Sequence, residues 1–278
     1  MPIISSVTYI LASQSNYRKG RANLMASDGR LDGKVAVISG GSRGIGAEMV
    51  RTFAAEGAKV MIGDQLQDQG RKLSAELGDR VRFEALDVRS IESWQNVMAA
   101  TQDAFGAVNI LVHSAGVMVV APIEMATEEQ FRIAFEVNVL GCFLGTRAVL
   151  DSMKRVGGGS IVVLSSAAGL EGSPGLSAYA SSKAANANFA RTAAMELGAY
   201  GIRVNAIAPG GIDTPMSNQP EFEGFDKNAW YGKLPVPRIG RTEEIARVAL
   251  LLASDEGSYM TGSVVNVDGG HMAGHSAL

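Results

Sequence analysis

The chain has 278 residues, of which 46% are hydrophobic and 19% charged, and its formal net charge is −3. This length suits one large α/β domain, and the lack of a basic stripe argues against a nucleic-acid partner. Cys142 is the single cysteine, which excludes an intrachain disulfide and favours a reducing compartment such as the cytoplasm. No unbroken apolar run reaches the ~20 residues that span a bilayer, so no membrane association is expected, and three scattered histidines offer no metal site.

The first 27 residues differ from the rest of the chain. Their only charges are Arg18, Lys19 and Arg21, and their apolar stretch is interrupted by serine and threonine. A basic start without acidic residues can resemble a signal or transit peptide. We expect a disordered extension or an upstream start instead, because Met25 would begin a normal N-terminus, and we place a single domain at residues 28–278.

Residues 34–39 form an apolar run typical of a strand buried on both faces. A glycine-rich stretch follows at once, and then a helical pattern runs to Glu56. In this context glycines let backbone N–H groups approach a pyrophosphate at the N-terminus of a helix. We therefore predict that this loop binds a dinucleotide through Gly40, Ser42, Arg43, Gly44, Ile45 and Gly46.

The second strand is predicted at residues 59–64, and Asp64 ends it, eighteen residues past Gly46. An acidic side chain there can accept hydrogen bonds from both hydroxyls of the adenosine ribose. It would repel the 2′-phosphate of NADP, whereas Arg43 could pair with that phosphate. Asp64 lies directly at the ribose in such a fold, so we predict NAD as the cofactor.

Strands and helices alternate through the rest of the chain. Asp87 and Val88 close the third strand, where they could meet the adenine. The alternation predicts an α/β Rossmann fold, a doubly wound parallel sheet of about seven strands with helices on both faces. Further strands are expected at 81–86, 109–113, 160–164, 202–208 and 263–267, and helices at 65–77, 90–105, 127–155, 177–200 and 242–253.

An alanine-rich helical segment carries Tyr179 and Lys183, four positions apart. Side chains at i and i+4 share a helix face, so the ammonium can lie beside the phenol. A nearby cation favours the phenolate and lowers the pKa of tyrosine from ~10. Such a phenol can exchange a proton with an alcohol or ketone oxygen.

Residues 211–240 have little apolar periodicity and carry four prolines. A long loop in a compact domain is often a mobile lid over a substrate. Its aromatic residues favour an apolar substrate, although they could equally pack against the base of the loop. These residues are Phe222, Phe225, Trp230 and Tyr231.

From Leu31 to Gly270 the motifs resemble, in order, those of the short-chain dehydrogenase/reductase family. The loop from Ser39 to Gly46 resembles the family's cofactor loop, with Ser39 in place of the usual threonine. The resemblance implies that Asp87 contacts the adenine. It also implies that the nicotinamide amide is held by a segment containing Pro209, Gly210, Ile212 and Thr214.

The same resemblance implies a catalytic set. Asn138 matches the residue that holds a water molecule in the proton relay. Ser166, thirteen residues before Tyr179, matches the serine that binds the substrate oxygen, and Ser165 is the lesser candidate. Tyr179 then carries the proton, and Lys183 lowers the pKa of Tyr179 and binds the nicotinamide ribose.

One motif departs from the family pattern. The usual Asn-Asn-Ala-Gly after the fourth strand is His113-Ser114-Ala115-Gly116 here. Ser114 can form hydrogen bonds, and Ala115 and Gly116 still allow close approach to the cofactor. We expect altered bonding at the strand end, which leaves the adenosine-ribose contacts open, and a structural role for His113.

The resemblance implies hydride transfer between NAD(H) and a secondary alcohol or ketone, with an apolar or cyclic, steroid-like substrate. It also implies a homotetramer whose dimers form through helices of residues 177–201. An NADPH-dependent 3-oxoacyl reductase is the alternative enzyme, and Arg43 would suit it. A non-catalytic dinucleotide-binding regulator is the alternative of another class, against which the complete set of Asn138, Ser166, Tyr179 and Lys183 argues.

Overall fold

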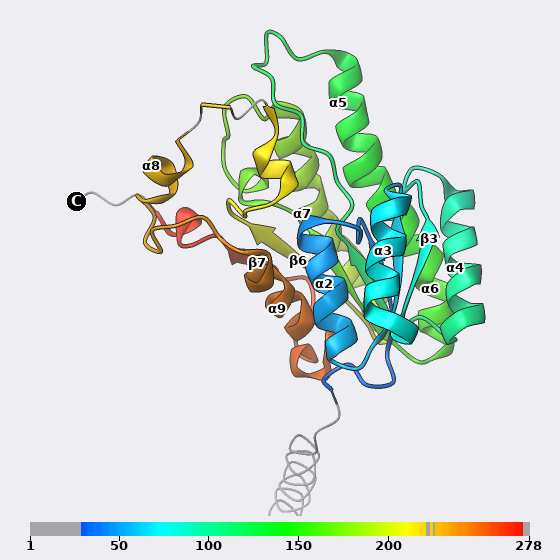
Figure 1. Cartoon of the computed structure of the whole chain (residues 1–278). Helices are drawn as coiled ribbons and strands as arrows, with labels where there is room; N and C mark the ends of the chain where they lie inside the picture. Colours follow the sequence, from blue (N-terminus) through cyan, green and yellow to red (C-terminus); the bar gives the residue numbers. More distant parts are fainter. Residues whose placement is uncertain (1–28, 221–222, 225, 275–278) are drawn as a thin grey trace, which may run out of the picture.

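The computed structural model describes residues 29–220, 223–224 and 226–274. The expected extension at residues 1–27 and the loop residues Phe222 and Phe225 lie outside these ranges. The described residues contain one parallel sheet in the order β3-β2-β1-β4-β5-β6-β7 (Figure 1). Its strands are β1 Val35–Ser39, β2 Lys59–Asp64, β3 Val81–Ala85, β4 Ile110–His113, β5 Gly159–Leu164, β6 Ile202–Pro209 and β7 Val264–Val267. The predicted doubly wound fold is confirmed.

Strand residues alternate between two cores. Ala36 and Ile38 of β1 pack on one face of the sheet, and Val35 and Val37 pack on the other. This period of two follows from the pleat of an extended chain. Both sets are buried because helices cover both faces, as the continuous apolar runs predict.

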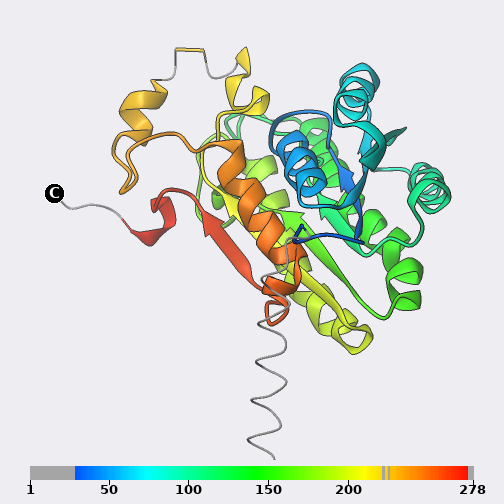
Figure 2. The same ribbon diagram turned by 60° about the horizontal axis from the view of Figure 1, so that its bottom comes forward.

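The first layer of helices consists of α2 Gly44–Ala55, α3 Gln67–Leu77 and α9 Thr242–Ala253. The second consists of α4 Ile91–Phe105, α6 Gly141–Arg155 and α7 Ser177–Leu197. The apolar faces of the two layers belong to the two different cores, and α2 lies beside α9 in both views (Figures 1 and 2). The order of the strands reverses between β1 and β4, which is where sheets of this kind bind ligands.

The helix predicted at residues 127–155 is divided. Thr127 caps α5 Glu128–Phe135, a π-helical turn, η2 Glu136–Leu140, follows, and α6 continues from Gly141. The combined stretch meets the length and composition criterion for a membrane span, with 39% of the tested window buried. A core helix meets the same criterion, and α6 packs on the sheet through Cys142 and Val149.

The loop at residues 211–240 contains two short helical turns that its sequence did not indicate, η5 Pro215–Asn218 and α8 Lys227–Tyr231. The base of the loop is closed by pairing between Ile212 and Gly240. The returning arm donates a hydrogen bond of 3.0 Å from Val236 N to Gly269 O. The C-terminal turn η8 His271–Ala273 therefore lies beside this loop at one end of the molecule (Figure 1).

Candidate active site

The glycine-rich loop between β1 and α2 is built for close backbone approach. A Cβ atom on Gly46 would lie 2.1 Å from the carbonyl oxygen of Gly40, and one on Gly40 would lie 2.6 Å from the backbone of Ala115. Arg43 precedes α2 without a capping side-chain hydrogen bond, and the first turn of α2 holds no acidic residue. Its N–H groups and helix dipole therefore fit an anion such as a pyrophosphate.

Asp64 is the last residue of β2 and contacts this loop. One carboxylate oxygen accepts a hydrogen bond of 2.9 Å from Ser42 N, and the other accepts one of 3.0 Å from Leu66 N. Two backbone donors thus hold the carboxylate at the position expected for a ribose. Arg43 is exposed and Ile45 packs against the core.

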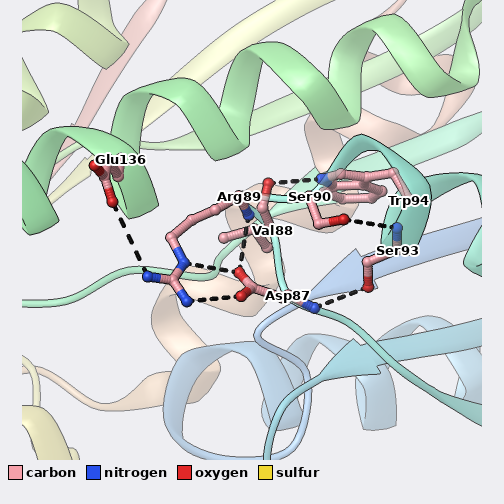
Figure 3. A network of polar contacts seen from close by, with 7 residues as sticks. All are labelled: Asp87, Val88, Arg89, Ser90, Ser93, Trp94 and Glu136. Atoms are coloured by element: carbon pink, nitrogen blue, oxygen red, sulfur yellow. Dashed lines mark hydrogen bonds and ion pairs between the residues drawn. The ribbon is translucent and has the colours of Figure 1, made fainter.

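The loop after β3 holds Asp87 and Val88 in a network of polar contacts (Figure 3). The backbone N–H of Asp87 donates to Ser93 Oγ at 3.0 Å, and Trp94 Nε1 donates to the carbonyl of Val88 at 3.0 Å. Val88 is buried, and a Cβ atom on Gly141 would lie 2.8 Å from it. The predicted adenine site therefore rests on a rigid loop.

Side-chain and backbone hydrogen bonds hold the end of β4 against the end of β1. His113 is buried, and its Nδ1 lies 3.0 Å from the hydroxyl of Ser39. That hydroxyl also accepts a hydrogen bond of 3.4 Å from Ala115 N, and Ser114 N donates to Ser39 O at 3.1 Å. Burial lowers the pKa of His113 to about 3. A neutral His113 thus ties the ends of β1 and β4 together.

Asn138 occupies the π-helical turn and is fully buried. Its Nδ2 donates to Val117 O at 3.0 Å and to Ser182 Oγ at 2.8 Å, and its Oδ1 accepts from Val117 N at 2.8 Å. Both polar atoms of this side chain are therefore hydrogen bonded to other protein groups. A water molecule of the expected relay would therefore bind the backbone carbonyl of Asn138. This carbonyl belongs to the π-helical turn, whose backbone hydrogen bonding is irregular.

Ser166 and Tyr179 meet at the carboxyl end of β5. The Ser166 hydroxyl faces the Tyr179 phenol closely enough to oppose the rise in the pKa of that phenol, and Ser166 Oγ accepts a hydrogen bond from Ala168 N at 3.2 Å. The hydroxyl of Ser165 instead donates to the carbonyl of Lys183 at 2.8 Å and is buried. Ser166 is thus the serine that faces Tyr179, as the spacing predicted.

Lys183 lies on the same face of α7 as Tyr179, with its Nζ 5.8 Å from the centroid of the Tyr179 ring. The ammonium donates to the carbonyl of Leu164 at 2.8 Å. A Cβ atom on Gly116 would lie 3.3 Å from this Nζ and 3.1 Å from Asn138 Oδ1. Gly116, Asn138 and Lys183 therefore lie close together.

The prediction of a lowered pKa for Tyr179 is not met. Burial raises the pKa of its phenol, and the Ser166 hydroxyl only opposes this shift. Burial also lowers the pKa of Lys183 to about 8. The physical reason is that the ammonium is directed to Leu164 O rather than to the phenol, so that desolvation dominates for both groups.

The segment after β6 completes the edge of the site. Gly210 N donates to Val267 O at 3.0 Å, and the side chain of Thr214 lies 3.6 Å from the position of a Cβ on Gly44. The segment from Pro209 to Thr214 therefore lies against the glycine-rich loop. The Thr214 hydroxyl accepts a hydrogen bond of 3.3 Å from Ser217 N.

Several contacts near the site were not indicated by any spacing in the sequence. Arg89 pairs with Asp87 at 2.7 Å, and His271 Nε2 lies 3.1 Å from Glu171 Oε1. The Tyr231 ring lies so close to Gly211 that a Cβ atom there would be 2.1 Å from it. Among the described residues, no group of three or more His, Cys, Asp or Glu could hold a metal ion.

Residues 40–272 match the family model described as enoyl-(acyl carrier protein) reductase. The 3-alpha-(or 20-beta)-hydroxysteroid dehydrogenase of Mycobacterium tuberculosis is 41% identical over 246 residues, which cover 88% of this chain and 92% of that protein. The trans-4-hydroxycyclohexanecarboxylate dehydrogenase of Sinomonas cyclohexanicum is 40% identical over 256 residues, which cover 89% of this chain and 96% of that protein.

Another relative is the NADP-dependent (R)-specific alcohol dehydrogenase of Lentilactobacillus kefiri. It is 38% identical over 250 residues, which cover 88% of this chain and 98% of that protein. The crystal structure of gox2181 superposes with a TM-score of 0.82 at 34% identity, covering 88% of this chain and 97% of that one. Both comparisons extend over nearly all of the chain beyond its first residues.

Proposed function

Since the chain belongs to the short-chain dehydrogenase/reductase family, we propose that it transfers a hydride between NAD(H) and a secondary alcohol or its ketone. The observation that carries this proposal is the meeting of Ser166 and Tyr179 beside Lys183, at the carboxyl edge of a sheet whose glycine-rich loop suits a dinucleotide. A regulator without catalysis would have no use for a serine hydroxyl placed beside the buried Tyr179.

Each part of the cofactor has residues that fit it. The N-terminus of α2 suits the pyrophosphate, Asp64 the adenosine ribose, and Asp87 with Val88 the adenine. The nicotinamide end is assigned to the segment from Pro209 to Thr214, with Lys183 at its ribose. When bound, the oxidised cofactor supplies the hydride acceptor and a positively charged ring that favours the phenolate form of Tyr179.

We assign NAD rather than NADP because of Asp64. Its carboxylate is fixed by Ser42 N and Leu66 N, so it cannot turn away from a 2′-phosphate, and the two negative charges would repel each other. Arg43 is exposed and could favour the phosphate, which keeps an NADPH-dependent 3-oxoacyl reductase as the second candidate. A titration of NAD+ against NADP+ with the same alcohol decides between the two.

Different side chains transfer the proton and position the substrate. Tyr179 gives a proton to the substrate oxygen in reduction and takes it back in oxidation. Ser166 hydrogen-bonds that oxygen and fixes its distance from the reacting carbon. Lys183 and the backbone carbonyl of Asn138 connect the phenol to solvent.

We propose an apolar, cyclic secondary alcohol as the substrate. The relatives named for hydroxysteroids and a hydroxycyclohexanecarboxylate support this class, as do Trp230 and Tyr231 on α8 of the substrate loop. The test is a panel of steroid, cyclohexanol, cyclopentanol and linear alcohols with each cofactor, read by the absorbance of the reduced nicotinamide. Turnover of none of them would contradict the proposed function.

A homotetramer is proposed from the exposed apolar side chains of two neighbouring helices. Phe131, Leu140 and Phe143 are each more than 40% exposed on the α5–η2–α6 stretch, and Met195 on α7 is 86% exposed. Apolar surface of this kind is usually covered by another subunit. Light scattering gives the mass in solution, and the mass of a monomer would contradict this assembly.

A further inference from the structure

Arg89 donates three hydrogen bonds to the carboxylate of Asp87. Its backbone N–H and its Nε donate to Asp87 Oδ1 at 3.0 and 2.9 Å, and its Nη2 donates to Oδ2 at 2.7 Å (Figure 3). A two-pronged guanidinium–carboxylate pair is stronger and more directional than a single charged contact. The orientation of the Asp87 carboxylate is therefore set by Arg89.

The guanidinium is also held from the opposite side. Its Nη1 lies 4.0 Å from Glu136 Oε2, and Glu136 begins the π-helical turn that carries Asn138. Figure 3 shows the guanidinium between the two carboxylates, with Asp87 on the loop after β3 and Glu136 on the helix across from it. Arg89 thus joins two elements that border the predicted adenine site.

The remaining partner of Asp87 is of a different kind. Gln65, an exposed residue directly after Asp64, is the weakest of the partners that lower the pKa of this carboxylate. A carboxylate accepts about four hydrogen bonds, of which Arg89 uses three. The fourth, on Oδ2, receives no donor from Arg89 and is the one that an incoming donor can occupy.

The 6-amino group of adenine is such a donor. We propose that Arg89 is a positioning residue for adenine recognition, which fixes Asp87 so that its exchangeable acceptor faces the 6-amino group and a 6-oxo purine is rejected. The inference rests on the proposed dinucleotide site and names what makes that site select its base. The oxygen of a 6-oxo purine would face the carboxylate oxygen of Asp87, so that two hydrogen-bond acceptors would meet. Sites that accept a hydrogen bond from a donor on their ligand reject analogues that lack this donor.

The test compares NAD+ with nicotinamide hypoxanthine dinucleotide, its 6-oxo analogue. KM and kcat are measured for the wild type, Arg89→Gln and Arg89→Lys, and dissociation constants of both reduced dinucleotides are measured by fluorescence. Gln65→Ala removes the exchangeable partner of Asp87, and Arg155→Gln removes an equal charge from the last turn of α6, where the arginine is exposed. These two variants are the matched controls.

We expect the wild type to favour NAD+ about tenfold, and Arg89→Gln to reduce this ratio below about threefold through a higher KM for NAD+ at unchanged kcat. Arg89→Lys should fall between the two because an ammonium cannot form the fork. Arg155→Gln should keep the wild-type ratio, and Gln65→Ala should not lower it, because it only removes a group that competes with the 6-amino group for Asp87.

Two results would overturn the inference. An equal rise in KM for both dinucleotides would mean that Arg89 only supports the fold, and an unchanged ratio in Arg89→Gln would mean that Asp87 needs no positioning. If no alcohol is turned over, the proposed reaction fails but the fluorescence measurement still decides the role of Arg89. If Arg89→Gln does not fold, Arg89→Lys, which keeps the charge, decides it instead.

Discussion

The contact between Gly211 and Tyr231 gives a sharp test of how the substrate loop is held closed. Gly211 lies in the segment from Pro209 to Thr214 after β6, and Tyr231 ends α8. A Cβ atom on Gly211 would lie 2.1 Å from both Cζ and Oη of Tyr231. The backbone of Gly211 is not in the positive-φ region, so alanine is tolerated there by the chain itself. Gly211→Ala must therefore displace the Tyr231 ring.

The size of the effect follows from what the ring loses. Tyr231 is half-buried and burial raises the pKa of its phenol, so displacing the ring exposes part of an aromatic side chain. Overpacking of this kind costs about 1–3 kcal/mol. If that energy opposes loop closure over the substrate, KM for the alcohol rises about tenfold or more, since 1.4 kcal/mol corresponds to a factor of ten.

The assay is a double-mutant cycle with Gly211→Ala, Tyr231→Ala and the double variant. KM and kcat for alcohol and NAD+ are measured for all four enzymes. We expect Gly211→Ala to raise KM in the wild-type background and to change little once Tyr231 is alanine. An equal effect in both backgrounds would refute the reasoning, because the added methyl group would then act on the cofactor segment and not through the ring.

Three further predictions follow from the site. Tyr179→Phe should lower kcat by about 10²–10⁴-fold with the dissociation constant of NADH unchanged, and near-normal turnover would contradict its role. Asp64→Ser should raise the preference for NADP+ over NAD+ by about tenfold or more, because like charges ~4 Å apart repel by about 1–4 kcal/mol, and steady-state kinetics with both cofactors checks this. The pKa of His113 is lowered to about 3 in the folded protein, so the unfolded chain binds the extra proton first as the pH falls and stability is lost between about pH 6.5 and 3. His113→Asn should flatten this part of the stability curve by about 2–4 kcal/mol, measured by denaturant unfolding at several pH values, and an unchanged curve would contradict the assignment.

The helices and strands that could be predicted from the sequence are those that a local pattern of residues defines. Strand β2 and helix α9 have the predicted boundaries because a short buried run and a clear apolar period each define an element locally. The dinucleotide loop was also predictable, since glycines between a strand and a helix have a direct steric meaning. A Cβ atom on Gly40 would lie 2.6 Å from the backbone of Ala115, so a side chain has no room there.

The features that were missed depend on contacts between distant residues. The π-helical turn surrounds Asn138, whose side chain bonds Val117 and Ser182, 21 and 44 residues away. Helix α8 has five residues, which is too short to show a period. The pairing of Glu171 with His271 and the fork of Arg89 on Asp87 have no spacing signature, because loops place these groups together.

The contacts of Tyr179 and Lys183 explain why the pKa of Tyr179 could not be predicted from the spacing of the two residues. The i, i+4 relation places the two side chains on one face but does not say where the ammonium donates, and here it donates to Leu164 O. Burial then shifts both groups toward their neutral forms, the phenol upward and the amine down to about 8. Near pH 7 the amine with this pKa is still mostly protonated, while the phenol keeps its proton. The site at rest therefore holds a protonated phenol beside Ser166, which is the state that reduction of a ketone requires. Oxidation of an alcohol first has to remove that proton, so its rate should rise with pH more steeply than the rate of reduction does.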